Sequence, residues 1–515
     1  MSNQTHSSPE DSEIVVGLVC AVGVNYKQCV HVIEAEFRKM GYVPRLVHLS
    51  GLMDTLAQQF ELEPIKSGLS ELERIRARMN MGNALREKTK KNDLIALSAI
   101  QQINSLRENN GPALGTVNIL ATLKRPEEVR ALRRVYGAGF FLIGLHDSEA
   151  GRINYLVDNQ GIDKVSAKRL MDDDQDDHKS AGQLTRETYY LSDVFVSLER
   201  KRYKEQISRF VELLFSHPYH TPTRDEYAMF MAFAASLKSA QLGRQVGASI
   251  VSEVGDVVAL GCNDVPRPGG GQYWCEDSDD KRDHVLRRDT NDVQKKLILR
   301  DLLSRFGCDG QTDGEIEEKA KGSLLADITE FGRAMHAEMD ALMSCVRNGI
   351  TARNGILYTT TFPCHNCARH ILGAGISRVV YIEPYAKSAA LDLHFDGITV
   401  DKFNDNKKKS TAGSRGKIPF ESFVGVGPRR YSDLFIMNPS YGLGIKRKRD
   451  GKTIPWPKDG KKPRLPMHVT SYLQREQLSV DEMKVLTAEG RRRNGDKSAN
   501  SRISKVPAAS RAKRS

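Results

Sequence analysis

Along the first 210 residues, two patterns of hydrophobic and polar positions alternate. Short apolar runs, which are typical of buried strands, are separated by longer stretches with apolar residues at helical spacing. The runs predict strands at residues 14–19, 43–49, 93–100, 117–122 and 140–145. The stretches between them predict helices at residues 26–40, 69–90 and 126–136. Because strands and helices alternate, we expect a parallel α/β domain over residues 13–210.

A second pattern follows a helical connector that is predicted at residues 191–216. Helices are predicted at residues 225–242 and 334–346, a β-hairpin at 244–251 and 257–261, and strands at 355–361 and 378–383. Another helix begins near Pro363, because proline is favoured in the first turn of a helix. These elements predict a second α/β domain over residues 220–440. Its polar insertion, residues 266–325, is expected to act as a lid or gating element.

The net charge of +12 is unevenly distributed along the chain. Residues 491–515 carry nine lysines and arginines against one acid, Asp496. We therefore expect residues 441–515 to be a basic, largely disordered tail, and the polar residues 1–12 to be disordered as well. Such a tail either aids solubility or contacts nucleic acid.

Composition argues against several classes of protein. No run of 18 apolar residues is present, so no membrane-spanning helix is expected. The first residues lack the apolar segment of a secretory signal. Eight cysteines among 515 residues are few for a disulfide framework. We therefore expect a cytoplasmic protein in a reducing environment.

Two short motifs in the second domain indicate metal chemistry. They read His336-x-Glu338 and Pro363-Cys364-x-x-Cys367. One imidazole and two thiolates can hold Zn²⁺ tetrahedrally and leave a fourth position open for water. Zinc lowers the pKa of that water toward about 7, and Glu338, which is not a ligand, can transfer its proton. The two motifs resemble the signature of the zinc-dependent nucleobase deaminases.

Two other interpretations of these motifs are a structural zinc site and a coincidental cysteine pair. A structural site needs four protein ligands, and His365 or His370 could supply the fourth. Neither histidine explains Glu338. A redox-active C-x-x-C pair would lack the upstream histidine and glutamate. The catalytic interpretation is the one that uses every motif residue.

The turn after the first predicted strand resembles a damaged phosphate-binding loop. Gly23 stands at a middle glycine position and Asn25 at the last, but Tyr26 occupies the place of the lysine, and Lys27 comes one residue late. With residues 76–86 and 123–129, the first domain resembles P-loop nucleoside-monophosphate kinases, which implies a P-loop NTPase-like fold. We expect nucleotide binding at Gly23, Asn25 and Lys27 without phosphoryl transfer. A degenerate domain with a structural or regulatory role is the alternative.

The second domain resembles the deoxycytidylate deaminases. The matching segments are residues 245–248, 261–266, 336–342, 363–368 and 381–385. The resemblance implies a cytidine deaminase-like α/β/α fold, with Asn263 at the sugar of the substrate and Tyr385 near the nucleotide. Arg244 lies beside a matching segment and could reach a 5′-phosphate. The alternatives are a turn-capping asparagine and a solvated surface charge.

The two domains together resemble the bacterial anti-phage dCTP deaminases. The resemblance implies zinc-dependent hydrolysis of dCTP, dCMP or both to the uracil form, which depletes dCTP during infection. A polynucleotide cytidine deaminase, a housekeeping dCMP deaminase in dTMP supply and a nucleotide-sensing regulator are the alternatives. We expect a homo-oligomer whose activity is restrained in healthy cells, and the N-terminal domain, a partner or an RNA could provide the restraint. A regulatory nucleotide is a further candidate ligand.

Overall fold

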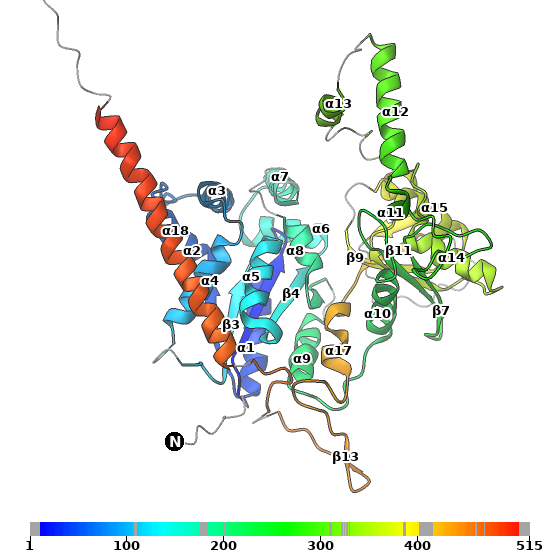
Figure 1. The fold of residues 1–515 in the computed structure, drawn as a ribbon. Helices are drawn as coiled ribbons and strands as arrows, with labels where there is room; N and C mark the ends of the chain where they lie inside the picture. The colour runs from blue at the N-terminus through cyan, green and yellow to red at the C-terminus, as the bar shows by residue number, and fades with distance from the viewer. Residues whose placement is uncertain are drawn as a thin grey trace, which may run out of the picture. The chain divides into compact units, whose positions relative to one another are not determined.

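The chain divides into two compact units in a computed structural model (Figure 1). Unit 1 consists of Met1–His220 and Asp433–Ser515, and unit 2 of Thr221–Ser432. The structure describes residues 11–107, 111–175, 184–199, 202–307, 312–320, 323, 325, 328, 330–384, 388–400, 416–458, 461–467 and 469–503. None of the described helices has the length and apolarity that crossing a membrane requires.

The sheet of unit 1 is parallel. Its strands are β1 (Ile14–Cys20), β2 (Val43–His48), β3 (Thr116–Ala121), β4 (Phe140–His146) and β5 (Val194–Ser197). They run in the order β2-β3-β1-β4-β5, and every pairing among them is parallel. Each residue of β1 and β3 is buried, as expected of a parallel sheet covered by helices. The predicted parallel α/β fold is confirmed.

The helices of unit 1 connect these strands. Some begin at a side-chain cap; the Ser70 hydroxyl and the Glu73 carboxylate, for example, form a capping box at the start of α3. The helices are α1 (Tyr26–Lys39), α2 (Leu49–Gln59), α3 (Glu71–Thr89), α4 (Leu94–Ser105), α5 (Pro126–Tyr136), α6 (Glu149–Asn154), α7 (Lys164–Gln175), α8 (Thr185–Tyr190) and α9 (Tyr203–Leu214).

Two predicted elements of unit 1 are wrong. Residues 93–100 were expected to be a strand, but they form most of α4, which contacts α2, α3, α5 and α18. A helix buried on nearly all sides and a buried strand give the same continuous apolar run. The helical connector predicted at residues 191–216 is interrupted by β5, because this short apolar run pairs with β4.

The C-terminal region also differs from the prediction of a disordered tail. Residues 469–503 form the long helix α18 (Val469–Ile503), which packs against α4 and α5 (Figure 1). Tyr472, Glu476 and Met483 are buried there at helical spacing. These residues give α18 one buried face that packs on unit 1, in spite of the basic composition of the last residues. The C-terminal region is therefore part of unit 1.

Unit 2 has a mixed sheet in the order β10-β11-β9-β8-β6-β7. β6 runs antiparallel to β7 and β8, as the predicted hairpin requires, and the remaining pairings are parallel. The strands are β6 (Gly247–Val251), β7 (Val257–Cys262), β8 (Ile356–Thr361), β9 (Arg378–Glu383), β10 (Ile398–Val400) and β11 (Ile418–Ser422). The main helices are α10 (Arg224–Ser236), α12 (Thr290–Arg305), α14 (Ala337–Arg347) and α15 (His365–Gly373).

A glycine allows α14 to lie directly on β7. A Cβ at Gly261 would stand 2.3 Å from the carbonyl oxygen of Ala337 and 2.4 Å from the backbone nitrogen of Ala341. No larger residue fits there unless the helix moves. The close contact fixes the start of α14, which carries the first metal motif.

Candidate active site

The two metal motifs meet because two helices begin close to each other. His336 is the N-cap residue of α14, and Cys364 is the N-cap residue of α15. Pro363 precedes that cap and does not lie in the first turn as predicted. Cys367 lies inside the first turn, and its backbone N–H is 3.5 Å from the Cys364 sulfur. Helix starts favour negative charge, which suits thiolate ligands.

The three predicted ligand atoms converge. The Nδ1 of His336 lies 3.2 Å from the Sγ of Cys364 and 3.5 Å from the Sγ of Cys367. All three ligand atoms lie within 4.8 Å of one another. Zinc holds sulfur at about 2.3 Å and nitrogen at about 2.0 Å, so its tetrahedral ligands lie roughly 3.5–3.8 Å apart. The donor atoms and their spacing therefore fit zinc.

Hydrogen bonds favour the ionised form of one cysteine. Contacts from Cys367 and then from His336 lower the pKa of Cys364 to about 4. The hydrogen bond with Cys364 in turn raises the pKa of His336 to about 9. A thiolate is the form of cysteine that binds metal, so Cys364 is prepared for this role.

A cavity of about 270 Å³ is bordered by two of the three ligands, His336 and Cys364. Residues from the segment before β6, the turn after β7, the insertion, the start of α14 and the end of β8 line it. Glu338 is on this wall and is only 4% exposed. Burial raises the pKa of its carboxyl group above the ordinary value. The carboxyl group is thus placed where it can exchange protons with a molecule in the cavity.

Asn263 follows β7 and also lines the cavity. Its Oδ1 accepts a hydrogen bond from the backbone N–H of Val246 at 2.6 Å, and its Nδ2 donates to the carbonyl oxygen of Arg244 at 2.7 Å. The side chain therefore holds the segment before β6 in place. The side-chain amide of Asn263 has two lone pairs on its oxygen and two N–H bonds, so one lone pair and one N–H remain for a ligand.

The remaining predicted substrate contacts have different outcomes. Arg244 lines the cavity, is 45% exposed at its side chain, and pairs with Glu383 at 3.3 Å. Tyr385 lies outside the described residues. Phe362, which the motifs do not include, adds an apolar ring to the wall and packs edge-on against Tyr381.

The insertion contributes two lining residues that the sequence did not identify, Asp289 and Asn291. Asp289 caps α12 by accepting hydrogen bonds from the backbone N–H groups of Asn291 and Asp292. The Asn291 amide donates to the carbonyl oxygen of Ile328 at 2.9 Å and accepts from the N–H of Phe331 at 3.3 Å. The capping signal predicts a helix start, but the sequence does not reveal that this start borders the cavity.

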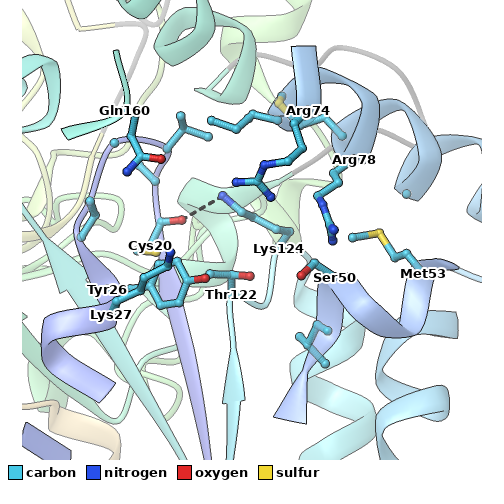
Figure 2. Close-up of a pocket in the computed structure, with 18 of the residues that line it drawn as sticks. Cys20, Tyr26, Lys27, Ser50, Met53, Arg74, Arg78, Thr122, Lys124 and Gln160 are labelled. Atoms are coloured by element: carbon cyan, nitrogen blue, oxygen red, sulfur yellow. Dashed lines mark hydrogen bonds between the residues drawn. The ribbon is translucent and has the colours of Figure 1, made fainter. Parts of the chain in front are cut away.

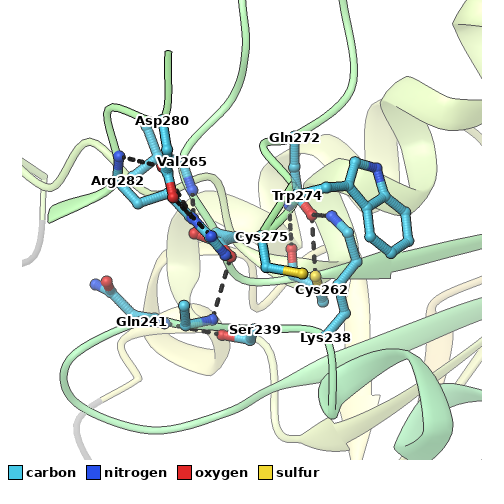
Figure 3. Close-up of polar contacts among 12 residues, drawn as sticks. Lys238, Ser239, Gln241, Cys262, Val265, Gln272, Trp274, Cys275, Asp280 and Arg282 are labelled. Atoms are coloured by element: carbon cyan, nitrogen blue, oxygen red, sulfur yellow. Dashed lines mark hydrogen bonds and ion pairs between the residues drawn. The ribbon is translucent and has the colours of Figure 1, made fainter. Parts of the chain in front are cut away.

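Hydrogen bonds fasten the beginning of the insertion to the core of unit 2 (Figure 3). The side-chain Nε2 of Gln272 donates to the backbone carbonyl oxygen of Cys262 at 2.6 Å. The Lys238 ammonium donates to the side-chain Oε1 of Gln272 at 2.9 Å. The Lys238 ammonium also lies 4.5 Å from the centre of the Trp274 ring. Arg282 pairs with Asp280 at 2.7 Å. Residues 272–282 are therefore held against the core of unit 2 and are not a free loop.

The residues of the damaged phosphate loop lie in unit 1. Gly23 and Lys27 line a second cavity there, whereas Asn25 is the N-cap residue of α1 and makes no side-chain cap. The loop already holds an acid, since the N–H of Val22 donates to the Asp174 carboxylate at 2.8 Å. The structure thus brings Gly23 and Lys27, but not Asn25, to the wall of this cavity, and nucleotide binding by these residues stays a prediction.

Comparison with known proteins identifies unit 2. Residues 222–383 match the cytidine and deoxycytidylate deaminase zinc-binding region. A deoxycytidylate deaminase of Enterobacteria phage T2 is 39% identical over 158 residues, which are 31% of this chain and 79% of the phage protein. ComE operon protein 2 of Bacillus subtilis (strain 168) is 31% identical over 134 residues, which are 24% of this chain and 70% of that protein.

A solved structure of the dCMP deaminase from the cyanophage S-TIM5, in complex with dCMP and dUMP, is 22% identical. It covers 34% of this chain and 92% of the phage chain at a TM-score of 0.21, which is too low to support a conclusion. The matched region contains all four motif residues, and the ligand set fits zinc, which is the cofactor of this domain. Through residues 222–383 and these relatives, the chain belongs to the cytidine and deoxycytidylate deaminase family.

Proposed function

We propose that unit 2 is a zinc-dependent hydrolase that converts dCMP, dCTP or both to the corresponding uracil nucleotide. The observation that carries this proposal is the convergence of His336, Cys364 and Cys367 beside the buried Glu338. In the reaction, the bond between C4 and the amino nitrogen of cytosine breaks. Water supplies the new carbonyl oxygen, and ammonia leaves.

The chain's own residues have distinct roles in this reaction. His336, Cys364 and Cys367 hold the metal; when bound, zinc supplies Lewis-acid chemistry that lowers the pKa of water toward about 7. Glu338 accepts a proton from the attacking water, passes one to the ring nitrogen N3, and then protonates the departing amine. Its buried position supports the proton transfers, because bulk water does not compete for the carboxylate.

The cavity supports a nucleotide as substrate. Phe362 offers an apolar face to the pyrimidine ring, and the free N–H and lone pair of Asn263 can bind the sugar hydroxyl. Arg244 can exchange Glu383 for a 5′-phosphate, since a guanidinium binds either group through the same N–H donors.

A direct assay tests this proposal. Purified zinc-loaded protein is incubated with dCMP, dCDP, dCTP, CMP and single-stranded DNA, and ammonia is measured. We expect release from the free deoxycytidine nucleotides and none from the DNA, and a Glu338→Gln variant should retain zinc and lose release. Ammonia release by that variant at the parental rate would rule out the assigned mechanism.

We further propose that this activity depletes dCTP during phage infection. The second α/β unit on the same chain supports this role, because an enzyme that consumes dCTP needs restraint in uninfected cells and such a unit can supply it. After infection, cells that express the protein should contain less dCTP and should form fewer plaques. Cells that express Glu338→Gln should show neither change. If the protein instead restores dTMP synthesis in cells that lack dCMP deaminase, and plaque numbers do not fall, the housekeeping role would be favoured.

A further inference from the structure

Unit 1 contains a second group of metal-ligating side chains, which the deaminase chemistry does not use. Glu212, His217 and His220 each place one ligand atom within 4.8 Å of the other two, and all three residues are half-buried. The cavity of about 220 Å³ in unit 1, shown in Figure 2, is lined by other residues. We refer to the three residues as the His-Glu cluster. Its place in the fold follows from how α9 ends.

The end of α9 brings Glu212 and His217 together. The helix closes with a Schellman motif, in which the N–H of His217 donates to the carbonyl oxygen of Glu212 at 2.9 Å. In the same motif the N–H of Ser216 donates to the carbonyl oxygen of Leu213 at 3.0 Å, and Ser216 has a φ of 61°. Glycine is usual at this left-handed position, because a Cβ crowds the backbone there. The motif fixes His217 beside the turn that carries Glu212.

The turn that follows α9, residues 217–220, is held in place by other parts of unit 1. The Nε of Arg447 donates to the carbonyl oxygen of Pro218 at 2.8 Å. The hydroxyl of Tyr219 lies 2.9 Å from the carbonyl oxygens of Arg447 and Ile454. These contacts fix the backbone of both histidines before any ligand binds, which lowers the entropic cost of binding.

Two imidazole rings share one carboxylate in this cluster. The rings of His217 and His220 are stacked, with 4.0 Å between their centroids. The Nε2 of His220 lies 2.5 Å from the Oε2 of Glu212, so one proton is shared between these two atoms. The Lys458 ammonium lies 2.7 Å from the other carboxylate oxygen, Oε1. Lys458 thus orients the carboxylate with Oε2 toward His220, in the way that outer hydrogen bonds orient the carboxylate ligands of metal sites.

His217 is available as a neutral ligand. Burial, followed by the charge of the neighbouring His220, lowers the pKa of His217 below its ordinary value. The ring is therefore neutral near pH 7, and neutral imidazole is the form that binds metal ions. Its Nδ1 accepts a hydrogen bond from the N–H of Tyr219 at 3.3 Å. This bond is exposed, so a metal ion can replace it at little cost, because water then takes up the N–H.

Two buried polar atoms beside the cluster lack a partner. The Oγ of Ser216 and the Nε1 of Trp456 make no hydrogen bond among the described residues. Ser216 directly precedes His217, and the Trp456 ring packs edge-on against the His217 ring with 4.5 Å between centroids. Buried polar groups are normally paired, so each unpaired one needs an explanation. A metal ion that carries a water molecule would bring such a partner to the cluster.

We propose that the His-Glu cluster binds a Zn²⁺ ion, which replaces the proton shared by His220 and Glu212 and releases it to solvent. Two imidazoles and a carboxylate suit zinc, whereas Ca²⁺ and Mg²⁺ prefer oxygen ligands. Zinc holds nitrogen and oxygen at about 2.0–2.2 Å, so its tetrahedral ligands lie roughly 3.3–3.6 Å apart. The ligand atoms are now between 2.5 Å and 4.8 Å apart, and small side-chain rotations bring them to this spacing.

The ion is expected to stabilise unit 1 and to take no part in deamination. It joins the last turn of α9 to residues 217–220, which directly precede unit 2 in the chain. Because the three ligands come together only in the folded unit, zinc stabilises that unit by mass action. Three protein ligands leave the fourth position of the ion to water.

Elemental analysis of the full-length protein tests this proposal. Protein that has been loaded with Zn²⁺ and dialysed against metal-free buffer should hold two zinc ions per chain, one in unit 2 and one on the His-Glu cluster. His220→Gln removes one ligand of the cluster, so this variant should hold one zinc ion. His31→Gln, the same change at an exposed position of α1, is the control and should hold two.

Fluorescence assigns the second ion to the cluster. In a Trp274→Phe background, Trp456 is the one tryptophan left in the chain, and its ring lies 4.5 Å from that of His217. Paramagnetic Co²⁺ quenches the emission of a nearby indole, whereas Zn²⁺ does not. Protein loaded with Co²⁺ should therefore emit less than protein loaded with Zn²⁺, and His220→Gln should abolish this difference.

Three results would overturn the proposal. The parent protein could hold one zinc ion per chain, or His220→Gln could hold as many as the parent. The third is equal emission from Trp456 in the Co²⁺ and Zn²⁺ forms, which would place the second ion elsewhere. If His220→Gln does not fold, the zinc count of the parent and the emission of its Trp274→Phe form still decide.

Discussion

Glu338 is buried among metal ligands, which is a costly place for a carboxyl group that has no function. We predict that Glu338→Gln lowers kcat by about 10²–10⁴, the usual contribution of a general acid and base. Zinc content, measured by elemental analysis, should not change, because Glu338 is not a ligand. Glu253→Gln, an exposed substitution in the turn after β6, is the control and should leave kcat unchanged.

The raised pKa of Glu338 also predicts a pH profile. The carboxylate must be ionised to accept a proton from water, so kcat/KM should fall as the pH drops through this pKa. Because burial raises the pKa above the ordinary 4.5, the acidic limb should lie above pH 4.5. Rates with dCMP across the pH range measure it. A limb at or below 4.5 would show that the free enzyme's Glu338 is not the titrating base.

Residue identity at the metal site could be predicted from sequence, but several residue roles could not. His336, Glu338, Cys364 and Cys367 lie in two short motifs whose spacing alone defines the chemistry. Asn263 was assigned to the sugar, and the structure adds its two hydrogen bonds to the segment before β6. Such bonds join residues far apart in sequence, so local spacing does not reveal them.

At the scale of elements, the start of α12 is tied to the segment that leads into α14. We predict that Asn291→Ala raises KM for the nucleotide about three- to tenfold, because the loss of two hydrogen bonds, worth about 0.5–1.5 kcal/mol each, loosens the cavity wall. Steady-state kinetics should show kcat within twofold of the parent. Arg305→Ala, an exposed change at the far end of α12, should alter neither value. An unchanged KM in Asn291→Ala would mean that the wall does not contact substrate.

Elements with a clear period or cap were predictable, and those set by tertiary contacts were not. The predicted strands at residues 14–19 and 140–145 correspond to β1 and β4, and the hairpin to β6 and β7. The run at residues 93–100 is helical because α2, α5 and α18 surround it, and this covering is not visible in the run itself. β5 is four residues long, and its identity depends on pairing with β4.

At the scale of the whole molecule, the sequence indicated two domains in order along the chain, but it did not indicate that the C-terminal region completes the first. The contact that closes unit 1 joins Arg107 to Glu476, 369 residues later. Arg107 also donates to Glu13, so one guanidinium serves two carboxylates. No local pattern links these three residues, and the basic composition of the last residues points in the opposite direction.

This cluster predicts how unit 1 responds to mutation. The side chains of Arg107, Glu13 and Glu476 are 0% exposed, and Arg107 lies 2.5 Å from each partner. Glu476→Gln leaves Glu13 to balance the Arg107 charge but replaces one carboxylate oxygen with an NH₂ donor that cannot accept from the guanidinium, so unit 1 should lose about 1.5–3 kcal/mol of stability. Glu482→Gln on the same helix is the control, since its pair with Lys91 is partly exposed and should contribute about 1 kcal/mol or less.

The chain's two tryptophans allow that loss to be assigned to one unit. Trp274 lies in unit 2 and Trp456 in unit 1, so a Trp274→Phe background leaves fluorescence that reports on unit 1 alone. Urea unfolding in this background should move to lower concentration for Glu476→Gln and stay within error for Glu482→Gln. If both variants unfold at the same urea concentration as the parent, then α18 does not contribute to the stability of unit 1. Residues 469–503 could then be removed without unfolding it.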